Sequence, residues 1–229
     1  MSRQSVKRFG GKDMLRQANM HPFFEGRKVY TRNEIRADAL VHGAGLLAAL
    51  AGSLVLLAHA GVSWVLVAYL FGLLVMLACS AAYNLTPPSQ LKWILRRFDH
   101  SAIFLLIAGT YTPLLPFLPD AAQGWTLGLV TWLGAAAGIA VKFLFPGRFD
   151  RIAILVYLAL GWVVVTAADA FMQVLPPPVI GLIAAGGILY TAGVIFYIWE
   201  SLKFHNAIWH GFVAAAAACH FAAIAMLYY

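Results

Sequence analysis

Four short groups of polar and ionisable residues interrupt an otherwise apolar chain, and their types are those that bind metals and transfer protons. The groups are Glu34, Asp38 and His42; Ser80 and Asn84; Asp99 and His100; and His205, Asn206 and His210. Within each of the first two groups the residues are four apart, which places them on one face of a helix. Ionisable residues inside long apolar segments are costly, so each group is a candidate site.

The combination of carboxylates, imidazoles and a hydroxyl suits metal-assisted chemistry. The imidazoles could bind a divalent metal, Asp99 could act as a base or orient a water, and Ser80 could hydrogen-bond a substrate or a metal-bound water. Structural roles stay open beside these. Ser80 and Asn84 suit packing between helices, Asp99 suits a helix start, and Glu34 and Asp38 suit the positive end of a helix dipole.

The composition indicates that lipid is the solvent of these segments. The chain has 229 residues, of which 62% are hydrophobic and 11% are charged, whereas a soluble domain carries about 25% charged residues. Cys79 and Cys219 lie inside apolar runs, so no disulfide framework is indicated. Nine of the sixteen Lys and Arg precede residue 37, a distribution typical of a membrane anchor and not of a nucleic-acid-binding face.

Seven apolar stretches are long enough to cross a bilayer as helices, which takes about 20 residues each. We predict spans at 38–59, 62–84, 100–118, 124–144, 152–174, 178–199 and 207–228. Turn residues such as Pro87, Pro88 and Pro146 mark the breaks. The predicted fold class is an all-α membrane protein, a seven-transmembrane helical bundle, with a basic N-terminal segment at 1–37 and a membrane domain at 38–229.

Basic residues fall only in alternate connections, and Lys and Arg accumulate on the cytoplasmic side of membranes. The N-terminus is therefore expected in the cytoplasm and the C-terminus outside. All four polar groups then lie at the cytoplasmic ends of their helices. Any site should open toward the cytoplasmic leaflet, with membrane lipids as partners.

Three stretches resemble the bacterial hemolysin III proteins, which belong to the wider progestin and adiponectin receptor (PAQR) family. They are EIRADALVHGAG at 34–45, CSAAYNLTPPSQLKWILRRFDHSAIFLLIAGTYTP at 79–113, and HNAIWHGFVAAAAACHF at 205–221. The resemblance implies seven spans and a zinc ion held by three histidines, one in an S-x-x-x-H motif and two in an H-x-x-x-H motif. It also implies an aspartate that positions a metal-bound water, and hydrolysis of lipid amides in several members.

By this resemblance Ser80, Asp99 and His210 match the family's serine, aspartate and last histidine. Asn84 and Asn206 stand where the other two histidines belong, and Asp38 stands where the family usually has asparagine. An asparagine carbonyl is a poor zinc ligand. The expected zinc site is therefore degenerate, unless His205, Asp38 or His42 reaches inward to replace the missing ligands.

Several function hypotheses follow. The first, which follows the resemblance, is a hemolysin III-like protein of the bacterial inner membrane that acts in membrane lipid homeostasis or sensing and has a degenerate zinc site. The second is a metal-dependent hydrolase of lipid amides or esters, with a rearranged site. The third takes the family name literally as a pore-forming hemolysin, which seven helices with almost no polar stripe support poorly. A transporter would be marked by a pair of broken helices, and the sequence shows none.

Overall fold

The protein was analysed as a computed structural model, which describes residues 21–229. That range contains helices and no strands, and seven of the helical segments are long and apolar enough to cross a membrane. The predicted all-α fold with seven membrane-spanning helices is thus confirmed. The bounds are η1 (Pro22–Phe24), α2 (Arg32–Ala60), α3 (Trp64–Leu85), α4 (Gln90–Tyr111), η2 (Leu115–Phe117), α5 (Ala121–Leu144), α6 (Asp150–Trp162), η3 (Val163–Ala167), α7 (Ala168–Val174), α8 (Pro177–Ile198) and α9 (His205–Tyr228).

Capping residues start several helices ahead of their apolar runs. Thr31 and Glu34 form a capping box, so α2 begins at Arg32, within the predicted 1–37 segment. Residues 1–20 of that segment, with five of its basic residues, lie outside the described residues. Ser89 accepts a hydrogen bond from the Lys92 backbone N–H and starts α4 at Gln90. The predicted start at residue 100 was therefore wrong, and Asp99 lies well inside the helix.

The fifth span is interrupted, which the sequence did not indicate. It consists of α6, the 3-10 turn η3 and α7. The hydroxyl of Tyr111 lies 2.7 Å from the Gly161 carbonyl oxygen and accepts a hydrogen bond of 2.9 Å from the Val164 backbone N–H. Irregular backbone at membrane depth is tolerated where such partners satisfy it.

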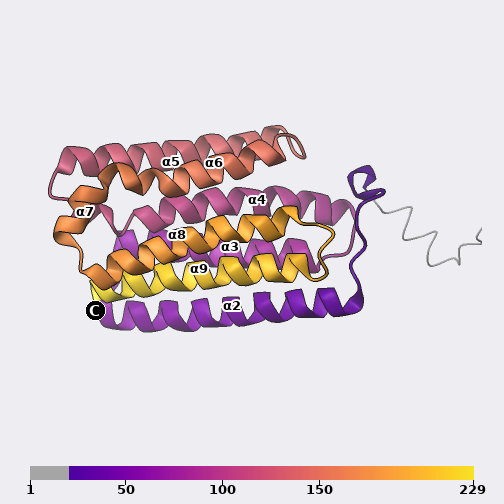
Figure 1. Ribbon diagram of the computed structural model, residues 1–229, viewed down its shortest axis with the longest axis horizontal. Coiled ribbons are helices and arrows are strands. Elements are labelled where there is room, and N and C mark those ends of the chain that lie inside the picture. The colour runs from indigo at the N-terminus through magenta and orange to yellow at the C-terminus, as the bar shows by residue number, and fades with distance from the viewer. Residues whose placement is uncertain (1–20) are drawn as a thin grey trace, which may run out of the picture.

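Figure 1 shows the helices running nearly antiparallel, with α5 and α6 in an outer pair above α4 and with α2 at the opposite side. Helix α9 packs against both α8 and α2, and α3 packs against both α2 and α4. The first and last membrane helices are therefore neighbours. This pairing brings the polar groups of α2 and α9 together.

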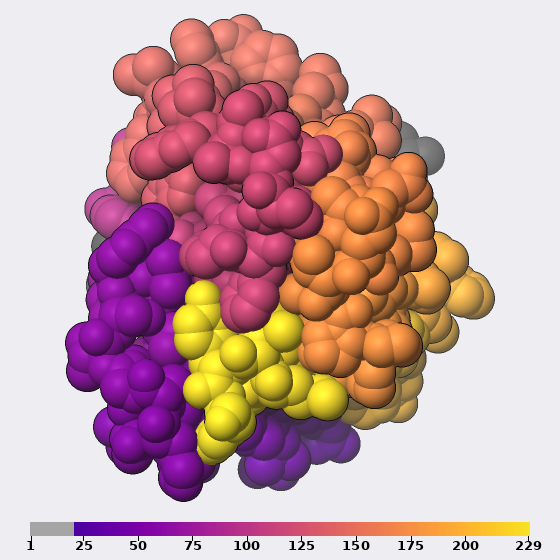
Figure 2. Space-filling model, turned by 90° about the vertical axis from the view of Figure 1, so that its left-hand side faces the viewer, coloured from indigo at the N-terminus to yellow at the C-terminus, as the bar shows by residue number. Residues whose placement is uncertain are grey.

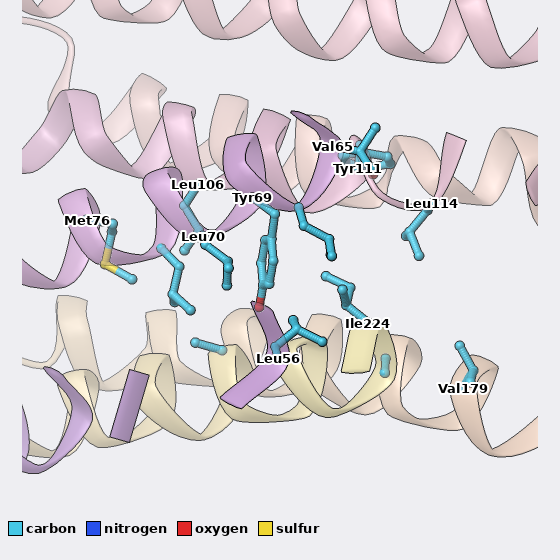
Figure 3. Packing of buried hydrophobic residues seen from close by; sticks show 14 of the residues in the cluster. Leu56, Val65, Tyr69, Leu70, Met76, Leu106, Tyr111, Leu114, Val179 and Ile224 are labelled. Atoms are coloured by element: carbon cyan, nitrogen blue, oxygen red, sulfur yellow. The ribbon is translucent and has the colours of Figure 1, made fainter. Parts of the chain in front are cut away.

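The apolar core fills the centre of the bundle between α2, α3, α4 and α9. Figure 3 shows Tyr69 between Leu70 and Leu56, with Ile224 of α9 close by, and all four residues are buried. Helices α3 and α4 approach closely because Gly72 lies against the backbone. A Cβ at Gly72 would stand 2.9 Å from the Leu105 carbonyl oxygen. Small residues allow such contact between membrane helices.

The exterior of the bundle is apolar as well, which suits a lipid environment. Large hydrophobic side chains such as Leu40, Leu54 and Trp125 are more than 70% exposed. Figure 2 shows the end that carries the C-terminus, where the α2–α3 connection, the segment after α4, α7 and the end of α9 lie side by side. The described Lys and Arg residues gather at the opposite end: before and in the first turns of α2, in the first turns of α4, around the α5–α6 connection and in the α8–α9 connection.

Candidate metal centre and adjoining cavity

The centre of the polar cluster joins α2 to α9. Nδ1 of His210 lies 2.6 Å from Oδ1 of Asp38, and the rings of His42 and His210 are 4.3 Å apart between centroids. All three residues are buried. One potential ligand atom from each lies within 4.8 Å of those of the other two. Nε2 of His42 is buried and has no hydrogen-bond partner among residues 21–229.

The two asparagines that stand in the family's ligand positions complete this cluster. The Asn206 side-chain amide donates to Oδ2 of Asp38 at 2.9 Å and to the side-chain oxygen of Asn84 at 3.2 Å. The Asn84 amide nitrogen lies 3.4 Å from Nε2 of His210 and 3.3 Å from Oγ of Ser80. Both asparagines therefore face the centre with amide N–H groups, which cannot bind a cation.

Asp99 and His100 lie beside this network on α4. Asp99 is buried, and its Oδ2 is 3.9 Å from Nε2 of His100. Behind them, Arg96 of α4 and Lys142 of α5 both pair with Asp150 at the start of α6, with the Lys142 Nζ to Asp150 Oδ1 distance at 3.0 Å. The sequence reasoning missed this ion cluster. The sequence feature that could have indicated it is Asp150, an acidic residue shortly after the Pro146-Gly147 turn with Arg148 and Arg151 close by in the sequence.

Two residues of the predicted groups serve elsewhere. Glu34 caps α2 through Thr31 and accepts a 3.2 Å hydrogen bond from the Phe204 backbone N–H. His205 is buried, but its Nε2 lies 3.2 Å from the Tyr30 hydroxyl and its Nδ1 lies 3.3 Å from the Phe196 carbonyl oxygen. Both ring nitrogens of His205 are therefore engaged outside the Asp38–His42–His210 group.

A large cavity of about 1460 Å³ runs from this cluster into the bundle. Its charged lining residues come from the end that holds the cluster. The lining there includes Asp38, Ser80, Asn84, Asp99, Asn206 and His210. Further in, the walls are mainly apolar side chains of α4, α6, η3, α7 and α8, including Leu106, Ile154, Val165, Phe171 and Ile183. Such a space suits a long apolar chain with a polar end.

Residues 21–31, which we call the N-terminal strap, cross the polar end of the bundle. The His21 ring stacks on Trp93 with centroids 4.4 Å apart. At the other end of the strap, Lys28 Nζ donates to the carbonyl oxygens of Glu200 and Leu202 at 2.8 and 3.2 Å. Strap residues also line the cavity. The sequence reasoning missed this role, which no residue pattern in the segment indicated.

How well a zinc ion fits the cluster depends on which side-chain atoms could bind it. The three-histidine set that the resemblance implies is not present, because Asn84 and Asn206 offer N–H donors to the centre. The group Asp38, His42 and His210 does fit, since two imidazoles and a carboxylate match a common zinc donor set with an open position. These residues are the ones that would hold a metal here.

The sequence matches known proteins over most of its length. Residues 30–221 match the family described as haemolysin-III related. The chain is 38% identical over 200 residues to the hemolysin-3 homolog of Bacillus subtilis, covering 84% of this chain and 93% of that protein. It is 37% identical over 199 residues to hemolysin-3 of Bacillus cereus, covering 84% and 90%.

A more distant relative is the human monocyte to macrophage differentiation factor, 28% identical over 214 residues, which cover 87% of this chain and 86% of that protein. This relative fits the wider PAQR superfamily. The family match, from residue 30 to residue 221, covers six of the seven membrane-spanning helices that the structure describes and most of the seventh. The protein is thus an integral membrane protein that belongs to the haemolysin-III related family.

Proposed function

We propose that this protein binds a membrane lipid in its cavity and acts in membrane lipid homeostasis or sensing. The observation that carries the proposal is the cavity of about 1460 Å³, whose charged residues lie at one end and whose remaining walls are mainly apolar. Those walls would replace the contacts that a lipid chain makes in the bilayer, because apolar side chains and lipid tails are similarly apolar. Its polar group would lie at the Asp38–Asn206–Asn84 network.

We further propose that the polar end faces the cytoplasm of a bacterium, with the chain in the inner membrane and its C-terminus outside. The basic residues at that end support this orientation, because Lys and Arg accumulate on the cytoplasmic side. Lipid would then enter the cavity from the cytoplasmic leaflet, and a sensor built in this way would respond to the composition of that leaflet. Reporter fusions at the two termini would test the orientation. A signal from a C-terminal reporter of a type that works only in the cytoplasm would contradict it.

Lipid binding can be tested with two isoleucines of α8. Ile183 lines the cavity, whereas Ile188 does not and is 59% exposed on the lipid-facing surface. Protein purified in mild detergent should carry lipid near one molecule per chain, measured by mass spectrometry of extracts. Ile183→Trp should lose most of this lipid and Ile188→Trp should keep it. Equal retention by both variants would show that the cavity is not the binding site.

A second candidate is a metal-dependent hydrolase of lipid amides or esters. It is favoured by the Asp38–His42–His210 group beside the cavity and by Asp99, a buried carboxylate that lines the same space. A divalent ion bound there would polarise a carbonyl and generate a water-derived nucleophile. Asp99 would accept the proton of the attacking water, and Ser80 would hydrogen-bond the lipid headgroup.

The hydrolase candidate is tested by incubating purified protein with a ceramide and with an ester lipid of the same chain length. Release of fatty acid by the wild type, and its loss in Asp99→Asn with lipid binding intact, would establish it. Absence of release from either substrate in metal-loaded protein would reject it. The family name also invites a leakage assay on dye-filled liposomes, in which dye release at nanomolar protein would establish a pore and displace both candidates.

A further inference from the structure

We infer that the metal centre of this protein is relocated onto helix α2, with Asp38, His42 and His210 as its ligands and with Asn84 and Asn206 as supporting residues. In this arrangement Asn84 and Asn206, which stand where the family has its first two histidines, do not bind the ion. They hold the ligands in place through hydrogen bonds. The inference does not depend on lipid binding, because its readout is metal content.

The first support is the unsatisfied imidazole of His42. Its Nε2 is buried and has no hydrogen-bond partner in the described part of the chain, although Oδ1 of Asp38 is 3.7 Å away. A buried polar atom without a partner is costly, and it is most costly where no water is present. A cation between His42, Asp38 and His210 would satisfy this nitrogen, and the ligand atoms of the three already lie within 4.8 Å of one another.

The second support is the way the asparagines contact the ligands. Asn206 donates to Oδ2 of Asp38 and leaves Oδ1 facing the histidines. Asn84 is fixed to the Ser80 carbonyl oxygen at 2.9 Å, and its own side-chain oxygen accepts a hydrogen bond from Asn206, which holds the Asn206 amide beside Asp38. Groups that hydrogen-bond to metal ligands fix their orientation and raise the affinity of the site. The asparagines therefore take a supporting role at this centre.

The third support is that His205 and Glu34, the other nearby candidates, lie outside the group. His205 is occupied by Tyr30 and the Phe196 carbonyl oxygen, and Glu34 caps the start of α2. Asp38, His42 and His210 form the one group among the described His, Cys, Asp and Glu residues whose potential ligand atoms lie close enough together to hold a metal ion. The two imidazoles and one carboxylate suit zinc in preference to magnesium or calcium, which favour oxygen ligands.

The test measures zinc per chain by elemental analysis of protein purified in mild detergent, together with the melting temperature with and without added zinc. The wild type should hold about one zinc and melt higher when zinc is added, because ligands that bind only the folded state stabilise it. His42→Ala should weaken zinc binding by at least about tenfold. The matched control His205→Ala, another buried histidine at this end of the bundle, should bind zinc as the wild type does.

A rescue variant separates a lost ligand from a damaged fold. Asn206 already points at Asp38, and Asn84 points at His210. Adding Asn84→His and Asn206→His to His42→Ala should therefore restore one zinc per chain on the family's own ligand positions. Wild-type protein that binds no zinc and shows no zinc-dependent melting shift would overturn the inference. So would His42→Ala protein with full zinc content.

Discussion

Nδ1 of His210 lies 2.6 Å from Oδ1 of Asp38, so a hydrogen bond joins the last membrane helix to the first in the middle of the polar cluster. Because the cluster is buried, this contact is both a ligand arrangement and a tertiary link between α2 and α9. Removing this contact should lower the free energy of unfolding as well as the metal content.

Asp38→Asn should lower the free energy of unfolding by about 1.5–3 kcal/mol, the usual range for a hydrogen bond to a charged group. The substitution keeps the size of the side chain but removes the carboxylate that accepts from His210. Thermal unfolding in mild detergent would measure the loss. Asp169→Asn is the control, since Asp169 is exposed on α7, and an equal effect of the two changes would argue against the link.

Tyr111→Phe should destabilise the break in the fifth span. The hydroxyl that it removes satisfies the Gly161 carbonyl oxygen and the Val164 backbone N–H. Leaving such groups unpaired at membrane depth costs about 1–3 kcal/mol. Hydrogen exchange at residues 160–167 should accelerate in this variant while exchange in α3 stays unchanged. Exchange that rises equally in both helices would point to a general loss of packing.

Gly72→Ala should push α3 away from α4. Its new Cβ would stand 2.9 Å from the Leu105 carbonyl oxygen, which belongs to the backbone and cannot rotate away. We expect a loss of about 1–3 kcal/mol, as for other over-packed cores. Gly181→Ala in α8, where a Cβ would meet nothing within 4 Å, should leave the melting temperature unchanged or raise it.

Asp150→Ala should destabilise the protein strongly, by about 3–5 kcal/mol, because it leaves the buried cations Arg96 and Lys142 without their shared partner. Adding Lys142→Met to this variant removes one of the two uncompensated charges. The double variant should therefore unfold at a higher temperature than the single one. A double variant less stable than Asp150→Ala would show that Lys142 contributes mainly by packing.

The strap should respond to alkaline pH through Tyr30. Burial, aided by the nearby Glu200 carboxylate, raises the pKa of Tyr30 to about 12, whereas a tyrosine in an unfolded chain ionises near pH 10. The stabilisation by this hydroxyl, which contacts His205, is therefore complete below about pH 10 and is lost as the pH rises toward the raised pKa. Between these values the melting temperature of the wild type should fall faster than that of Tyr30→Phe. Parallel curves would contradict this reading.

The sequence predicted the fold well because the membrane imposes a simple rule. An apolar run of about 20 residues satisfies its backbone hydrogen bonds in lipid by forming a helix. The number of spans could therefore be counted from the apolar runs of the sequence. The start of α4 was misplaced because its first turns carry Lys92, Arg96 and Arg97 and are set by the Ser89 cap. The break at Val163–Ala167 escaped because it depends on a hydroxyl from another helix, that of Tyr111.

The candidate site was predicted in outline but not in its connections. Spacing by four placed Asp38 and His42 on one face of a helix, yet no pattern could show that this face meets His210. His205 drew attention because it neighbours a family ligand position. Its ring instead contacts Tyr30, from a segment for which the sequence predicted only a basic cytoplasmic role. Contacts between distant segments decided both outcomes.

The uneven distribution of charge along the cavity gives it a direction. Charged residues line the end near Asp38 and Asp99, and mainly apolar side chains line the rest. An amphiphile placed headgroup-first into the far end would bury its polar group among mainly apolar walls, and burying a polar group without a full set of hydrogen bonds is costly. The cavity therefore favours one orientation of such a molecule, with the headgroup toward the polar cluster. In that orientation the bond next to the headgroup would lie beside α2 and α9.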